Sequence, residues 1–440
     1  MKSILALIAL FCVASSTAQP LRTSAGREPI RGEIIAYPSF DEALAAGTGA
    51  SKYLTPLDQW RHEGAVSTTD FIVPFAWANR QVLLHIASAS TDYEIFINNR
   101  SAGYNANPTI PVDFNITKWA HEGKNTLEIR LANPSSFAPL ESWTEGSTFH
   151  LGHVYLLSQP TMRVRDVTVK TWAVEDEMKA EIGIVIRSSA LNRKTSRVYY
   201  ELRNPANEVA ASGHKDLTLD MRREDTLRFV TTIPRLFQWT VEQPTQYTLL
   251  LKTQYEGRYL EFMRLPLGFR IVEMHDGQMA INGLPTTLHA TVVAPTITDN
   301  EILGLKDKGY NTLKIATGAA ATDDFYNRCD LLGIYVIAQA PLNTRRSGMD
   351  IRKGGNPTNN PAWLAAYLER TSDSYHATKR HPSVIAFSLA EQSANGFNLY
   401  ESYLNMKQLN EVRPFIYLDA GGQWNSDRLT MDATATPSSL

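Results

Sequence analysis

Apolar and polar residues alternate with a period of two over much of the first 270 residues. Successive side chains of a β-strand point to opposite faces of its sheet, so this alternation predicts strands with one buried face. Short strands at regular spacing, separated by turns rich in Asn and Gly, are typical of a β-sandwich. The first group of predicted strands comprises 70–74, 82–86, 93–97 and 126–131.

The stretch from 162 to 265 repeats this pattern with a different spacing. Its clearest predicted strands are 179–186 and 247–251, and Pro160 marks the boundary with the preceding group. The pattern therefore predicts a second, smaller sandwich.

The period changes after Gly268, where strands begin to alternate with helices. Thr298 and Glu301 form the pattern of a capping box, which predicts a helix that ends at Gly309. Further helices are predicted at 322–332, 361–379 and 398–412, and strands at 311–315, 334–338, 384–388, 415–418 and 428–431. Such alternation is typical of βα units around a parallel sheet.

Composition places the chain among globular proteins, with 43% hydrophobic and 20% charged residues. Its formal net charge of −2 provides no basic excess for phosphate, which argues against a nucleic-acid partner. Of its two cysteines, Cys12 lies near the N-terminus and Cys329 lies on an apolar helical face, so no disulfide is expected in the mature chain.

Residues 1–18 have the pattern of a signal peptide. Lys2 precedes an apolar segment at 4–13, and the small residues 16–18 offer a cleavage site. Ten apolar residues are too few to cross a bilayer core of about 30 Å. We therefore expect export to the periplasm or the extracellular space, and no membrane span.

Six short motifs lie at 98–104, 114–127, 154–160, 267–270, 276–283 and 380–385. In these motifs and in their order, the chain resembles glycoside hydrolase family 2, the family of β-galactosidase-like enzymes. The segment 380–385, for example, reads R-H-P-S-V-I and is similar to the family's N-H-P-S-V-I at the fourth barrel strand.

The resemblance and the change of period together imply a multidomain fold. We expect a signal peptide at 1–18, a jelly-roll-like sugar-binding-like sandwich at 19–160, an immunoglobulin-like β-sandwich at 161–270 and a partial (β/α) TIM-type barrel at 271–440. The last segment has 170 residues, against roughly 250 for a complete barrel, so the barrel is expected to be incomplete.

The resemblance also implies where a catalytic acid/base would lie. The family has S-L-G-N-E-S after the fourth strand, whereas this chain has S-L-A-E-Q-S at 388–393. The acid/base position therefore holds Gln392, whose amide carries no titratable proton. Glu391 is a weak catalytic candidate, since a shift of one residue normally points a side chain in another direction. A capping or solvated role is the alternative for Glu391.

Other polar positions of the family's barrel are replaced too. The corresponding segments read H-A-T-V-V-A at 289–294, L-K-I-A-T-G at 313–318 and A-Q-A-P at 338–341. The family's nucleophile follows its seventh strand, and no equivalent is found in this sequence. No cofactor or metal site is indicated by the motifs, and His289 within an apolar strand is expected to be a core residue rather than a ligand.

Three aromatic residues are weak candidates for stacking on a sugar ring, with ordinary packing as the alternative for each. They are Trp143, Trp424 and Tyr104. The expected partner is a β-linked glycoside or a protein that completes the barrel, and an open barrel edge would also permit a homo-oligomer.

Three functions remain open at this point. The first is a hydrolytically impaired family 2 homologue that binds carbohydrate or a partner. The second is an active exo-acting glycosidase that hydrolyses O-glycosyl bonds with Glu391 and residues outside this chain. The third is a structural assembly module.

Overall fold

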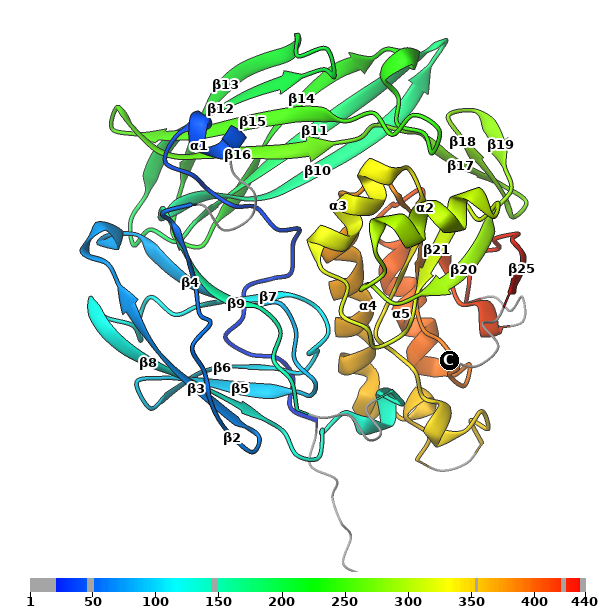
Figure 1. Ribbon diagram of the computed structural model, residues 1–440, viewed down its shortest axis with the longest axis horizontal. Coiled ribbons are helices and arrows are strands. Elements are labelled where there is room, and N and C mark those ends of the chain that lie inside the picture. The colour runs from blue at the N-terminus through cyan, green and yellow to red at the C-terminus, as the bar shows by residue number, and fades with distance from the viewer. Residues whose placement is uncertain (1–20, 46–50, 144–148, 353–354, 421–424, 436–440) are drawn as a thin grey trace, which may run out of the picture.

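The computed structural model describes residues 21–45, 51–143, 149–352, 355–420 and 425–435. Two antiparallel sandwiches lie beside a parallel sheet with its helices (Figure 1). This arrangement confirms the expected fold class of two β-sandwiches followed by a partial (β/α) barrel. The signal peptide at 1–18 lies outside the described residues and stays a prediction.

The first sandwich packs a four-stranded sheet on a five-stranded one. Alternate side chains of both sheets enter a common core, as the period of two predicts. In spatial order the sheets are β1 (Leu54–Pro56), β9 (Val154–Gln159), β4 (Gln81–Ile86), β7 (Val112–Asn115), and β2 (Arg61–Glu63), β3 (Val66–Val73), β8 (Gly123–Leu131), β5 (Tyr93–Ile97), β6 (Arg100–Asn105).

The second sandwich has longer strands and its own core. Its sheets are β10 (Met162–Val174), β11 (Glu177–Ser188), β14 (Glu224–Ile233), and β13 (Val209–Leu219), β12 (Lys194–Arg203), β15 (Tyr247–Tyr255), β16 (Arg258–Leu267). A small sheet then leads to the barrel, formed by β17 (Val272–His275), β18 (Gln278–Ile281) and β19 (Leu284–Thr286).

The third part is a six-stranded parallel sheet. Its strands in spatial order are β24 (Phe415–Ile416), β23 (Val384–Ser388), β22 (Tyr335–Gln339), β21 (Thr312–Ile315), β20 (His289–Val293) and β25 (Asp432–Ala435). The α-helices are α1 (Phe40–Ala45), α2 (Asp299–Asp307), α3 (Asp323–Leu332), α4 (Leu364–Thr378) and α5 (Phe397–Lys407). Short 3₁₀ helices occupy 75–77, 138–140, 235–237, 345–347, 357–359, 361–363 and 418–420. Among the described residues, no helix is both long and apolar enough to cross a membrane.

The prediction of a sixth strand at 428–431 is wrong about the position of that strand. The strand is β25, and it pairs with β20, the first strand, at the opposite edge of the sheet from β24. Leu429 and Met431 are apolar because they pack against Ile337 and Ile416 of the sheet. Burial across the sheet therefore accounts for the apolar pattern at 428–431.

Asp427, which directly precedes this segment, covers part of the sheet edge at β24. The Phe415 N–H donates to Asp427 Oδ2 at 2.8 Å, and the Asp427 N–H donates to the Phe415 carbonyl at 2.9 Å. Both backbone groups of this edge residue are thereby occupied within the chain. A protein that completes the barrel, and a homo-oligomer, stay predictions.

His289 differs from the expectation of a core residue. It is the first residue of β20, where it is exposed and lies 2.9 Å from an Asp432 carboxylate oxygen. Its apolar neighbours follow it in the strand rather than surround it. Cys329, by contrast, is buried on α3 as expected.

The R-H-P-S motif has a structural role between α3 and β23. His381 is buried between two carboxylates of α3, at 2.7 Å from Asp330 and 3.1 Å from Asp323. The neighbouring Pro382 packs on Gly268, where an added Cβ would lie 2.5 Å from the proline ring. The motif thus fastens the barrel to the end of the second sandwich.

A buried ion pair joins the first sandwich to α4. Arg370 Nη2 lies 2.6 Å from Glu141 Oε1, and both side chains are at most 1% exposed. Arg370 also donates to the carbonyls of Ala106 and Pro341. Removal of one buried charge leaves the other without compensation, which costs more than the pair contributes.

Replacement of Arg370 by Met is therefore expected to lower the free energy of unfolding by about 3 to 5 kcal/mol. Urea denaturation of both proteins measures this change. The exposed pair formed by Arg197 and Asp216 provides the control, and Asp216→Asn should leave the denaturation midpoint unchanged. Equal midpoints for Arg370→Met and the unmodified protein would contradict a structural role for the pair.

Stability should also depend on pH through His381. Burial alone would lower the pKa of His381, but the Asp330 and Asp323 carboxylates outweigh it and raise the pKa to about 9. The folded pKa then exceeds the unfolded value of about 6.5, so the stabilisation is complete below that pH and is lost as pH rises through 9. The difference in Tm between the protein and His381→Asn should shrink over this range, and a constant difference would count against it.

Candidate active site at the carboxyl ends of the barrel strands

The parallel strands β20 to β24 end at one edge of their sheet, where catalytic side chains of TIM barrels are found. The loop after β23 carries the S-L-A-E-Q-S motif, and its Glu391 N–H donates to the Leu342 carbonyl at 2.9 Å. This bond joins the loop to the one that follows β22.

Glu391 is held by two residues of the β21 segment. Lys314 Nζ donates to Glu391 Oε1 at 2.8 Å, and the Thr317 hydroxyl donates to Oε2. Lys314 is a strand residue with only 7% exposure. In a TIM barrel, side chains of alternate strands share a layer. This explains how a residue of β21 reaches one that follows β23.

The electrostatics of this contact favour the ionised carboxylate. Burial alone would raise the pKa of Glu391, but the Lys314 ammonium and the hydrogen bonds from Lys314 and Thr317 hold it below its ordinary value. Glu391 is therefore deprotonated at neutral pH, and each of its oxygens accepts one hydrogen bond.

Gln392, the next residue, points elsewhere. It is exposed and has a φ of 45°, in the left-handed region. Its N–H donates to Asp419 Oδ2 at 2.6 Å, and its side-chain oxygen lies 3.4 Å from Asn343 Nδ2. The left-handed turn separates the directions of Glu391 and Gln392, as expected for consecutive residues that leave a strand.

Two polar residues at this edge were not predicted as site residues. Asp419 follows β24 and accepts the Gln392 N–H. Gln339, at the end of β22, is 8% exposed and its Oε1 has no hydrogen-bond partner among the described residues. A polar residue at the end of an apolar strand is the signal that could have identified Gln339.

The three aromatic candidates have different surroundings. Trp143 is half-buried and lies against Gly318, where an added Cβ would be 2.2 Å from the indole ring. Gly318 directly follows Thr317, so Trp143 of the first sandwich lies beside the strand-end site. Tyr104 is 5% exposed, donates to Asp92 at 2.6 Å and has the Arg22 guanidinium over its ring. Trp424 lies outside the described residues.

Two family models match this chain. One is described as "Glycosyl hydrolases family 2, TIM barrel domain" and matches residues 296–437; the other is described as "Glycosyl hydrolases family 2" and matches residues 162–270. Together these matches cover more than half of the chain. The chain belongs to glycosyl hydrolase family 2.

Curated relatives agree with this assignment. A "Beta-galactosidase" of Psychromonas ingrahamii is 25% identical over 375 residues, which are 80% of this chain and 35% of that protein. A "Beta-galactosidase" of Priestia megaterium is 26% identical over 362 residues, or 77% of this chain and 34% of that protein. This family 2 chain thus spans about a third of the length of these relatives.

Solved structures confirm the fold. A putative β-galactosidase from Bacteroides fragilis superimposes with a TM-score of 0.70 at 14% identity, over 84% of this chain and 59% of that chain. A β-glucuronidase from Bacteroides uniformis gives a TM-score of 0.68 at 16% identity, over 80% of this chain and 46% of that chain.

The Lys314 contact should control the ionisation of Glu391. Replacement of Lys314 by Met removes the charge while burial remains, so the pKa of Glu391 should rise above its value in the unmodified protein. Titration of ¹³C-labelled glutamate carboxyls by NMR measures this change. Thr317→Val removes only a hydrogen bond and should give a smaller rise. An unchanged Glu391 titration in Lys314→Met would refute the contact.

Proposed function

We propose that this family 2 homologue is hydrolytically impaired and binds a β-linked carbohydrate at the strand-end site. The observation that carries the proposal is the state of the S-L-A-E-Q-S loop. Gln392 stands at the acid/base position, and the only carboxylate beside it in sequence, Glu391, is ionised and held by Lys314 and Thr317.

A glycosidase needs a proton donor for the leaving oxygen. The Gln392 amide has no acidic proton. Glu391 has a lowered pKa and is a poor general acid, because a catalytic acid must retain its proton near the working pH. As a base or nucleophile, Glu391 would have its negative charge offset by the Lys314 ammonium, which lowers its basicity.

Carbohydrate binding is supported by groups that remain around the site. Trp143 offers an amphipathic ring beside Gly318, and Asp419 and Gln339 add hydrogen-bonding groups at neighbouring strand ends. The curated relatives carry the name β-galactosidase, which makes a β-galactoside the first ligand to test. Export by the apolar segment 4–13 is part of the same proposal.

We expect hydrolysis of p-nitrophenyl β-galactoside at the background rate. General acid catalysis alone contributes typically 10²- to 10⁴-fold, and Gln392 cannot supply it. Gln392→Glu should not restore turnover. The new carboxyl could donate a proton, but no catalytic nucleophile to act with it is identified among the described residues. Turnover that Glu391→Gln abolishes would instead establish an active glycosidase.

Binding is tested with methyl β-galactoside by titration calorimetry. We expect heat of binding with the unmodified protein and a loss of at least about tenfold in affinity for Trp143→Ala. Trp172→Ala is the matched control, since Trp172 is 40% exposed on the second sandwich. Unchanged affinity in Trp143→Ala would place the sugar elsewhere, and no binding at all would favour an assembly module or a protein partner.

A further inference from the structure

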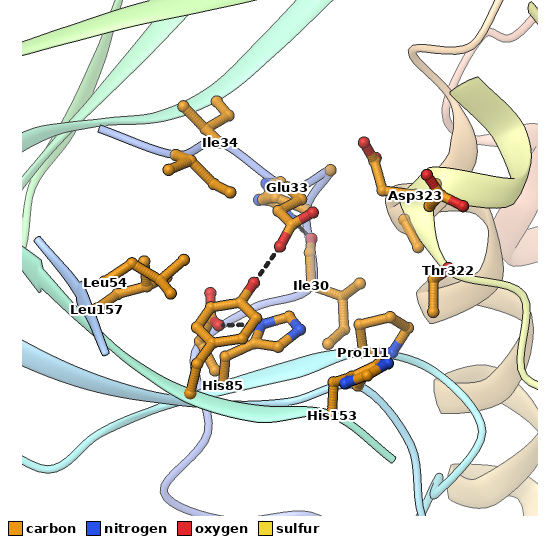
Figure 2. Close-up of a pocket in the computed structure, with 18 of the residues that line it drawn as sticks. Ile30, Glu33, Ile34, Leu54, His85, Pro111, His153, Leu157, Thr322 and Asp323 are labelled. Carbon is orange, nitrogen blue, oxygen red and sulfur yellow. Dashed lines mark hydrogen bonds and ion pairs between the residues drawn. The ribbon is translucent and has the colours of Figure 1, made fainter. Parts of the chain in front are cut away.

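A cavity of about 340 Å³ lies between the first sandwich, the segment 29–35 and the barrel helices α3 and α4 (Figure 2). Its volume falls within the usual size range of small-molecule pockets. None of the strand-end residues Glu391, Gln392, Lys314, Thr317 and Asp419 lines it, so it is a separate site.

The cavity has an apolar wall and a polar end. Ile34, Leu54 and Leu157 lie on one side and provide apolar surface, Ile30 lies on the other side near Thr322, and Glu33 points inward between them (Figure 2). Apolar lining with a few convergent polar groups is typical of a ligand pocket.

Glu33 differs from two neighbouring carboxylates, those of Asp113 and Asp323, because it lacks an ion-pair partner in the part of the chain that the structure describes. Asp113 has a partner in His85, whose Nδ1 lies 2.8 Å from Asp113 Oδ1. Asp323 has Arg380 at 3.2 Å and His381 at 3.1 Å. Glu33 accepts a hydrogen bond from the Tyr155 hydroxyl, and no ion pair found among the described residues includes its carboxylate. The Arg380 guanidinium donates to the Glu33 backbone carbonyl, at 3.1 Å, and pairs with Asp323. The carboxylate therefore faces the cavity without a cation of its own.

The surrounding charge favours a cation in this cavity. Its lining has five carboxylates, those of Glu33, Asp58, Asp113, Asp323 and Asp324, against two arginines, Arg31 and Arg165, and two histidines, His85 and His153. Both arginines have acidic partners, with Arg31 at 3.2 Å from Asp166 and Arg165 at 3.8 Å from Glu28. Burial raises the pKa of Glu33 despite the opposing charge of His85, and Asp323 raises it further. A bound positive charge would offset this penalty.

The residues that line the cavity favour an organic cation over a metal ion. A metal ion needs several oxygen or nitrogen ligands, and no group of three or more His, Cys, Asp or Glu in the described part of the chain could hold one. The apolar wall would be left empty by a bare ion. The Tyr155 ring already stacks on His85 with centroids 4.3 Å apart, so one of its faces is closed to a sugar.

We propose that this cavity binds a small organic cation, with a primary ammonium group against Glu33 and an aliphatic body against Ile34, Leu54 and Leu157. The ammonium replaces the missing partner of the Glu33 carboxylate. The aliphatic body covers apolar surface that water would otherwise contact.

Cyclohexylammonium and cyclohexanol are suitable probes, because they have the same ring and differ in charge. We expect the ammonium to bind on the order of 1 mM by calorimetry, as suits a ligand of this size, and the alcohol to bind at least about tenfold more weakly. Glu33→Gln keeps an acceptor for the Tyr155 hydroxyl and removes the charge. It should weaken ammonium binding at least about tenfold.

Asp58→Asn is the matched control, since it removes one negative charge from the exposed part of the same lining. It should change the affinity by less than about threefold. Ala321→Phe fills the cavity without altering its charges and should abolish binding, which keeps the test valid if Glu33→Gln does not fold. Equal binding of both probes, tighter binding of methyl β-galactoside, or equal effects of Glu33→Gln and Asp58→Asn would overturn the proposal.

Discussion

The ion pair between Lys314 and Glu391 is the contact on which the state of the strand-end site depends. Lys314 is nearly buried in a strand, where an ammonium without a partner would be costly. Glu391 is the partner at 2.8 Å, so each charge makes the burial of the other tolerable. The pair fixes the direction of Glu391, which leaves Gln392 exposed on a left-handed turn. This contact, together with the amide at Gln392, determines the protonation chemistry that the loop offers.

Local patterns in the sequence predicted most of the elements correctly. The capping box at Thr298 forms as expected, with Glu301 bonded back to Thr298, and Gly333 ends α3 in the left-handed conformation. The strand at 428–431 was wrong because Leu429 and Met431 pack across the sheet. An apolar pattern indicates which residues are buried but not which residues they pack against. The order of the strands in the sheet could therefore not be predicted from the sequence.

The same limit applies to the sites. The family motif placed Gln392 correctly in the loop after the fourth strand, and the charge at Lys314 was visible in the sequence. That Lys314 and Glu391 meet depends on the layers of a barrel, which join residues of alternate strands. The cavity around Glu33 draws on segments from residue 29 to residue 378, and no local pattern connects them (Figure 2). Its lining could be found only after the domains were assembled.

Covalent labelling tests the central claim of an impaired site most directly. A retaining glycosidase forms a glycosyl-enzyme through its nucleophile, and a β-glucuronidase of Bacteroides uniformis has been seen covalently bound to a cyclophellitol-type aziridine. The galactose-configured aziridine should be incubated with this protein and the intact mass measured. Our account predicts an unchanged mass. A stoichiometric mass gain that maps to Glu391 or Asp419 would contradict it.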